Sequence, residues 1–217
     1  YLKLGLRDWK VPVGLAKSFI TTLYLTTDFY KDLSMKLHSP DYFDQRYVSQ
    51  SFDRAALTYE QWDNLPKMIG EYLLERLEGL NLHPEQILDI GAGTGRLLRA
   101  LRQRYSQAHL YAVDISMPML QQARHQASPG SSTPHWICAE ATQLPVPNDC
   151  IDLLISNLML PWCNDIHSVF AEFARVLTPQ GILLFSTLGT DTLKELRHSW
   201  AAVDNTIHVH KFWDMHD

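Results

Sequence analysis

From about residue 84 onward, short apolar runs alternate with segments in which apolar residues recur every three or four positions. The short runs are typical of buried strands, and the longer segments of amphipathic helices. The predicted strands cover residues 86–90, 109–113, 135–139, 151–156 and 181–187. The predicted helices cover residues 96–105, 117–126, 166–177 and 190–203. This alternation predicts βαβ units with right-handed crossovers, and therefore an α/β fold with a mostly parallel sheet flanked by helices.

The region before the alternation differs in pattern. Residues 46–82 read as helical, with Ser49 as a suitable N-cap. A buried helical stripe is indicated by leucines at three- and four-residue spacing: Leu73, Leu74, Leu77 and Leu80. Residues 1–45 are mixed, because 18–24 is a β-branched and aromatic run whereas 29–37 has a helical pattern.

Composition narrows the class of protein. Of the 217 residues, 46% are hydrophobic and 20% charged, which excludes intrinsic disorder, and the net charge of −5 argues against nucleic acid as the main partner. The cysteines, Cys138, Cys150 and Cys163, are odd in number and form no CxxC pair, so we expect no disulfide framework, no zinc site and a cytoplasmic location. No uncharged apolar run of about 18 residues occurs and no signal-peptide pattern is visible, so we expect no membrane association.

The strongest chemical signal is a glycine-rich turn after the strand at 86–90, within the sequence Ile-Leu-Asp-Ile-Gly-Ala-Gly-Thr-Gly. Glycines allow the chain to turn tightly and a ligand to approach the backbone, and the following helix offers unpaired N–H groups. Asp114 ends the next strand, at the position where a carboxylate commonly accepts both hydroxyls of a ribose. A bound nucleoside is therefore expected at this edge of the sheet.

The spacing of the glycines distinguishes two kinds of nucleotide. Dinucleotide enzymes use GxGxxG, whereas here Asp89 precedes a GxGxG turn formed by Gly91, Gly93 and Gly95. This turn resembles the S-adenosylmethionine (SAM) loop of class I methyltransferases, which implies a Rossmann-like fold. SAM has no phosphate, but it has an ammonium group that Asp89 would help to hold, by charge or through water.

Two further polar residues end predicted strands. Glu140 follows the third strand, where an acid in this fold class often reaches the adenine amino group; the alternative is a solvated carboxylate in a loop. Asn157 ends the fourth strand at the carboxyl edge, where ligands bind, although Asn also forms turns for purely structural reasons. With the loop, the expected cofactor-binding residues are Asp89, Gly91, Ala92, Gly93, Gly95, Asp114, Ile115, Met119, Glu140, Ala141 and Asn157.

Beyond the SAM loop, residues 46–217 resemble the BioC family, the malonyl-acyl-carrier-protein O-methyltransferases of biotin synthesis. The segments that carry this resemblance are 48–56 with Tyr59, 87–95, 114–116 with Met119 and Leu120, 144–145, 157–163, 185–196, and then Trp200, Val203, Asp204, His208, Val209 and Phe212. The stretch 185–196 is the most specific, because other methyltransferases share the SAM loop but not this stretch.

The resemblance suggests how the chain is divided. Residues 46–217 are expected to form the methyltransferase domain, with an N-terminal helical lid. Family members continue beyond Phe212, and parts of 1–37 resemble their later segments, so residues 1–45 are interpreted as displaced C-terminal elements, as in a circular permutation. The alternative is an unrelated extension ahead of a start near Met35.

The resemblance implies methyl transfer from SAM to the free carboxylate of malonyl-acyl carrier protein. Such a carboxylate is ionised at neutral pH, with a pKa of about 4, and needs no general base. Tyr59 is the candidate catalytic residue, as a hydrogen-bond donor or as a ring facing the sulfonium, against simple packing in the lid. Trp162 and Arg54 are the substrate-binding candidates, with core packing and an exposed helix arginine as their alternatives.

The remaining expectations concern partners. Carrier proteins are acidic, and Lys194, Arg197 and Lys211 are candidates for docking one by sign alone. His208 and His210 lack an accompanying carboxylate motif, so no metal is expected. Rival functions are a C-methyltransferase of quinone synthesis, an assembly factor that hydroxylates an arginine of a respiratory subunit, and a non-catalytic SAM-fold module; the intact loop with Asp89 and Asp114 argues against the last.

Overall fold

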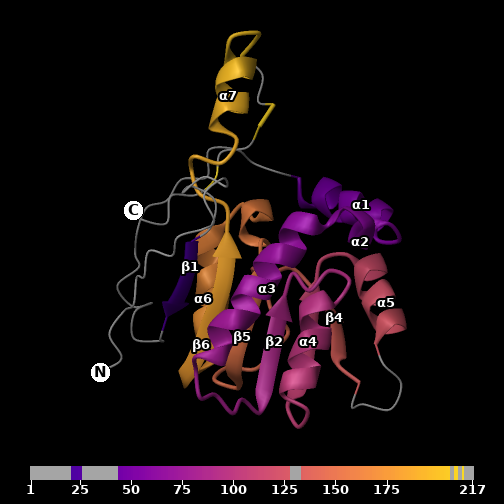
Figure 1. Cartoon of the computed structure of the whole chain (residues 1–217), viewed down its shortest axis with the longest axis vertical. Helices are drawn as coiled ribbons and strands as arrows, with labels where there is room; N and C mark the ends of the chain where they lie inside the picture. Colours follow the sequence, from indigo (N-terminus) through magenta and orange to yellow (C-terminus); the bar gives the residue numbers. More distant parts are fainter. Residues whose placement is uncertain (1–20, 26–43, 128–132, 206–207, 210–211, 213–217) are drawn as a thin grey trace.

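The computed structural model describes residues 21–25, 44–127, 133–205, 208–209 and 212. Within these residues a six-stranded sheet has the order β1-β6-β5-β2-β3-β4. The strands are β1 (Thr21–Leu25), β2 (Gln86–Ile90), β3 (His109–Asp114), β4 (His135–Cys138), β5 (Ile151–Asn157) and β6 (Leu177–Thr187). Strands β2 to β6 run parallel to one another, and β1 is antiparallel to β6 (Figure 1). The predicted α/β fold with a mostly parallel sheet is therefore confirmed.

The helices follow the predicted alternation. They are α1 (Gln45–Ala55), α2 (Tyr59–Trp62), α3 (Asn64–Glu78), α4 (Arg96–Arg104), α5 (Met117–Gln126), the 3-10 turn η2 (Leu160–Trp162), α6 (Ile166–Val176) and α7 (Lys194–Ala201). Most boundaries agree with the prediction to within two residues, but two elements begin four residues away from their predicted starts. Strand β6 begins at Leu177 rather than at Gly181, and α7 begins only at Lys194, because Leu193 at its N-cap has a left-handed φ of 55°.

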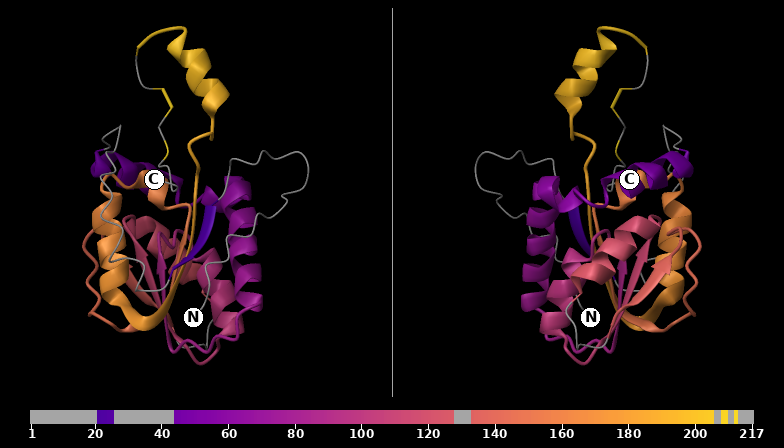
Figure 2. Two further views of the ribbon diagram at one scale, coloured as in Figure 1. Left: turned by 90° about the vertical axis from the view of Figure 1, so that its left-hand side faces the viewer. Right: turned by 90° about the vertical axis from the view of Figure 1, so that its right-hand side faces the viewer.

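Side chains along every strand point alternately to the two faces of the sheet, so both faces carry apolar residues. Helices cover both faces. On one face, Leu88 and Phe185 pack with Phe173 of α6. On the other, Ile87 packs with Leu77 of α3 and Leu101 of α4. Figure 2 shows α6 on one side of the sheet and α3 on the other.

Three members of the expected leucine stripe lie on α3, whereas Leu80 lies beyond its end, and the predicted N-cap at Ser49 is wrong. Leu73 and Leu77 are fully buried. Helix α1 begins four residues earlier than Ser49, and the side chain of Asp44 caps it by accepting a hydrogen bond from the Arg46 amide. Ser49 lies inside the helix, where its hydroxyl donates to the carbonyl of Ile115 at 3.3 Å.

Residues 21–25, which overlap the β-branched and aromatic run at 18–24, form β1 beside the last parallel strand, β6. Thr21 pairs with Thr187 and Leu25 with Leu183 in the antiparallel ladder. The predicted helix at 29–37 falls outside the described residues. The division of the chain at residue 45, and the interpretation of 1–45 as displaced elements, stay predictions.

The lid helices α1 and α2 lie above the carboxyl ends of the strands, whereas α7 extends away from the body of the molecule (Figure 1). The glycine turn after β2 and the acid that ends β3 lie at the same edge as the lid. In open α/β sheets this carboxyl edge is where ligands bind. The fold therefore places the expected site between the sheet edge and the lid.

Candidate functional site

The turn after β2 has the backbone conformation that its glycines permit. Gly91 and Gly93 have φ values of +74° and +54°, a region that L-residues rarely adopt. A Cβ on Gly91 would lie 2.6 Å from Cβ of Met159, so the turn packs closely on the segment after β5. A Cβ on Gly93 would meet no atom within 4 Å, so the backbone of the middle glycine faces open space. The turn thus offers a place where a ligand can approach the main chain.

Asp114 fastens this turn to the neighbouring strand. One carboxylate oxygen accepts the Gly93 amide at 2.8 Å, and the other accepts the Ser116 amide at 2.8 Å. Burial raises the pKa of Asp114, and these two hydrogen bonds oppose the rise. Each carboxylate oxygen has more than one lone-pair direction, so both retain acceptor capacity for ribose hydroxyls.

Asp89 is buried at the end of β2, and neither of its carboxylate oxygens has a hydrogen-bond partner among the described residues. Burial, and then the nearby Asp114, raise the pKa of Asp89 to about 8. Buried polar groups in native proteins are nearly always partnered, so an orphaned carboxyl group next to a ligand-binding turn indicates a missing partner. A cationic ligand group would compensate Asp89 either directly or through water.

The lid places aromatic side chains over the same edge. Phe52 of α1 lies between Tyr59 and Trp162, with ring centroids 6.3 Å and 5.4 Å away. Burial, followed by the charges of Asp63 and Asp114, raises the pKa of Tyr59, so its hydroxyl stays protonated at neutral pH. Tyr59 is therefore available as a hydrogen-bond donor within the lid.

Three hydrogen bonds hold α1 in this position. Ser49 donates to the Ile115 carbonyl at 3.3 Å, and the Ser116 hydroxyl donates to Asp53 at 2.6 Å. At the start of the helix, the side-chain amide of Gln45 donates to the backbone carbonyl of Trp162 at 3.0 Å. The lid is thus tied to the ends of β3 and β5, although sequence reasoning assigned none of these bonds.

Several predicted cofactor residues have other contacts. Asn157 donates to the Pro66 carbonyl at 2.8 Å and accepts from Ser186 at 2.7 Å, so its amide joins α3 to the sheet. Met119 is fully buried in α5, and Ala92 is buried beside Leu97. These residues therefore support the site by packing and by hydrogen bonds within the protein.

The remaining candidates lie nearer to solvent. Glu140 is exposed, and its carboxylate accepts a long hydrogen bond of 3.5 Å from Thr142. Ala141 and Ile115 are half-buried at the carboxyl ends of β4 and β3. Arg54 is exposed and donates to Ser51 on its own helix at 3.4 Å, and Trp162 is 40% exposed at the Phe52 ring. The structure thus brings Trp162, but not Arg54, into contact with the aromatic cluster of the lid.

The described residues contain no group of three or more His, Cys, Asp or Glu side chains arranged to hold a metal ion. Nor does any helix among residues 44–127 and 133–205 combine the length and apolar character needed to cross a membrane.

Comparisons with known proteins give matches to methyltransferases. The family model described as "Methyltransferase domain" matches residues 88–185. The malonyl-[acyl-carrier protein] O-methyltransferase of Halorhodospira halophila is 42% identical over 174 residues, which cover 80% of this chain and 59% of that protein. The enzyme of the same name from Methylovorus is 42% identical and is covered to 60%. The chain thus spans about three fifths of the length of the curated relatives it matches.

Solved structures share the fold at low identity. The [4+2]-cyclase SpnF matches with a TM-score of 0.59 and 20% identity, over 70% of this chain and 63% of that one. The PH0226 protein of Pyrococcus horikoshii matches with a TM-score of 0.51 and 21% identity, over 75% and 70%. Residues 88–185 therefore match the methyltransferase-domain family, the chain shares its fold with these solved structures, and over 80% of its length it is similar to the malonyl-[acyl-carrier protein] O-methyltransferases.

Proposed function

We propose that the protein transfers a methyl group from SAM to the free carboxylate of malonyl-acyl carrier protein, a step that enters biotin synthesis. The observation that carries the proposal is the 42% identity to enzymes of this name. It is supported by Asp89, Gly93 and Asp114, which lie at the carboxyl edge of the sheet beneath the aromatic lid. Because the chain covers about three fifths of those relatives, the whole activity is a proposal.

The residues at the carboxyl edge suit SAM. Asp114 would accept the ribose hydroxyls, the open backbone at Gly93 would admit the nucleoside, and the orphaned Asp89 would balance the methionine ammonium. When bound, SAM supplies an activated methyl group on a sulfonium. Glu140 is proposed as a contact to the adenine, since it is exposed at the end of β4 beside the site.

A carboxylate acceptor of the methyl group needs little catalytic assistance from the protein. It is already ionised at neutral pH, so the chain need only orient it and exclude water. The Tyr59 hydroxyl, kept protonated by burial, would donate to the carboxylate, and Trp162 with Phe52 would wall the acceptor pocket. No side chain is required to remove a proton from the nucleophile.

The carrier-docking residues expected from charge gain little support. Lys194 pairs with Asp191 at 3.4 Å, and Arg197 donates to the backbone carbonyls of Thr190 and Thr192. Lys211 lies outside the described residues. We propose malonyl-acyl carrier protein as the partner on the names of the relatives, without assigning its docking surface, and a cytoplasmic location on the cysteine pattern alone.

The test is to incubate the protein with methyl-labelled SAM and malonyl-acyl carrier protein, and to measure a base-labile methyl ester on the carrier. The ester is expected with the carrier substrate and more weakly with malonyl-CoA. A protein that binds S-adenosylhomocysteine (SAH) but forms no ester would contradict the assigned acceptor. It would favour the alternatives of quinone C-methylation or arginine hydroxylation.

A further inference from the structure

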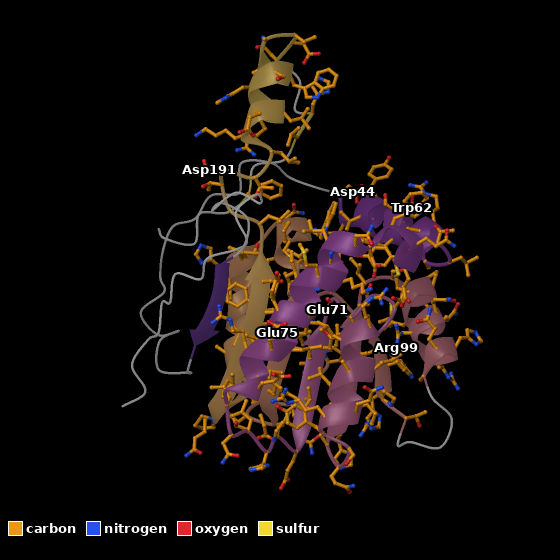
Figure 3. All side chains as sticks on the ribbon, viewed as in Figure 1. Asp44, Trp62, Glu71, Glu75, Arg99 and Asp191 are labelled. Atoms are coloured by element: carbon orange, nitrogen blue, oxygen red, sulfur yellow. The ribbon has the colours of Figure 1, made fainter. Side chains whose placement is uncertain are left out.

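A cluster of charged residues joins the lid to the first helix of the nucleotide-binding unit. Asp63, at the start of α3, accepts both Nε and Nη2 of Arg96 at 3.0–3.1 Å, and its carboxylate is nearly buried. Glu60 of α2 accepts Nη2 of Arg99 at 2.8 Å and lies 3.4 Å from Arg96. Figure 3 labels Trp62 on the lid side of this contact and Arg99 on α4.

The same cluster holds the glycine turn itself. Thr94 lies between Gly93 and Gly95, is buried, and donates its hydroxyl to Glu60 at 2.7 Å. Arg99 donates to the Thr94 carbonyl at 2.7 Å while it pairs with Glu60. Burial raises the pKa of Glu60, but the hydrogen bonds from Thr94 and Arg99 outweigh it and leave the pKa below its usual value. Glu60 is therefore ionised and bound to the turn that would face the cofactor.

Position along the chain connects this contact to the lid aromatics. Tyr59 immediately precedes Glu60 in the sequence. The hydrogen bond between Thr94 and Glu60 therefore also restricts the position of the Tyr59 ring. Glu60 also lies 3.4 Å from Arg96, which binds Asp63 at the start of α3, so both ends of α2 are held against α4. A shift of α2 away from α4 would therefore move Tyr59 relative to Asp114.

We propose that Glu60, Asp63, Arg96 and Arg99 form an ionic latch with Thr94, and that this latch couples occupancy of the glycine turn to closure of the helical lid. The proposal rests on the proposed function only in taking the occupant to be SAM or SAH. The four charged residues are positioning residues, since they act on the ligand through Thr94 and Tyr59. Coupling of this kind is reciprocal: a ligand that orders the turn stabilises the latch, and an intact latch raises ligand affinity by the same factor.

Exposure explains why the latch can open. The side chains of Glu60 and Arg99 are 27% and 29% exposed, so salt screens their attraction, whereas Asp63 is 5% exposed and strongly prefers its bidentate partner. We expect the Glu60 end to respond to ionic strength and the Asp63 end to act as the fixed hinge.

Glu60→Gln tests the latch, because the amide oxygen still accepts from Thr94 while the charge is lost. The matched control is Glu172→Gln, which removes the charge from the Glu172–Arg175 pair on α6, with 2.6 Å between Nε and Oε1, on the far side of the sheet, while its amide oxygen still accepts from the Leu144 backbone amide. We expect Glu60→Gln to weaken SAH affinity by about fivefold or more in low salt, within the usual range of coupling between sites. Glu172→Gln should leave SAH affinity unchanged, and added salt should bring the wild-type affinity towards that of Glu60→Gln.

Hydrogen exchange reports the lid directly. SAH should protect the amides of residues 45–62 in the wild-type protein and in Glu172→Gln, and protect them less in Glu60→Gln. Equal affinity, salt response and protection in Glu60→Gln and wild type would overturn the latch, as would an equal loss in Glu172→Gln. These outcomes differ from failure of the proposed function, which appears as SAH binding by the wild type without ester formation.

Discussion

The carboxylate of Asp114 accepts the backbone amide of Gly93 at 2.8 Å, so the acid that ends β3 holds the middle glycine of the turn after β2. This bond presets the turn with its backbone facing open space, since a Cβ on Gly93 would meet no atom within 4 Å. A ligand that enters here does not have to order the loop, which lowers the entropic cost of binding. The carboxylate and the glycine therefore act as one unit.

Asp114→Asn should weaken SAH binding by about tenfold or more, because hydrogen bonds to a charged acceptor contribute about 1.5–3 kcal/mol. The amide would also turn an N–H towards Gly93 or Ser116, both of which donate to Asp114. Calorimetric titration with SAH measures the change. Asp152→Asn is the control, since Asp152 likewise accepts two backbone amides, from Glu85 and Gln86, but at the opposite end of the sheet; equal losses in both variants would contradict a binding role for Asp114.

Gly93→Ala and Gly91→Ala should separate binding from stability. Alanine at Gly93 enters open space, so its cost is the left-handed φ of +54°, about 1–2 kcal/mol, yet its methyl group would occupy the ligand's approach. Alanine at Gly91 would additionally collide with Met159 at 2.6 Å. Thermal unfolding with and without SAH should show a modest loss of Tm and no SAH-induced rise for Gly93→Ala, and a larger loss of Tm for Gly91→Ala. A Gly93→Ala protein that still binds SAH would refute the assigned approach.

The sheet and its flanking helices follow from the sequence because burial repeats with a fixed period there. Helix α5 and strand β2 have the predicted bounds, since each is delimited by strong local signals: Ser116 caps α5, and Gly91 ends β2. The lid shows the limit of this reasoning. Ser49 has the chemistry of an N-cap, but its hydroxyl is used for a tertiary bond to Ile115 that no local pattern encodes.

The glycine turn and its acid were visible for the same reason, since a short motif carries the whole arrangement. The latch was not, because Asp63 and Arg96 are 33 positions apart and Glu60 and Arg99 are 39 apart, with no periodic relation between them. Asn157 was located correctly at the carboxyl edge, but its amide bonds to Pro66 and Ser186 appear only once α3 is packed against the sheet. Contacts between distant segments are what the sequence alone left open.

Tyr59→Phe should lower the rate of methyl transfer by about tenfold or more while SAH affinity changes little. The ring and its packing on Phe52 remain, but the protonated hydroxyl that would donate to the carboxylate acceptor is lost. Steady-state kinetics with malonyl-acyl carrier protein and SAH titration measure the two effects. Tyr105→Phe removes another buried hydroxyl, at the C-cap of α4, and should change neither. A Tyr59→Phe enzyme with the wild-type rate would leave the ring, facing the sulfonium or packing in the lid, as the role of this residue.

Asp89→Asn should remove a pH dependence of stability. Burial and Asp114 raise the pKa of Asp89 to about 8 in the folded protein, above the 3.8 of an unperturbed carboxyl group. Between these values the folded state retains a proton that the unfolded state has lost, so the stability contributed at low pH is lost as pH rises from about 4 and the loss is complete above about 8. The slope is at most about 1.4 kcal/mol per pH unit.

Urea unfolding at pH 5 to 9 should therefore show a wild-type free energy of unfolding that falls relative to that of Asp89→Asn and then levels off. Any constant cost of the buried amide cancels in this comparison, and parallel pH profiles would show that Asp89 is ionised in the fold. SAH, whose ammonium would favour the ionised carboxylate, should reduce the slope in the wild type and leave Asp89→Asn unaffected.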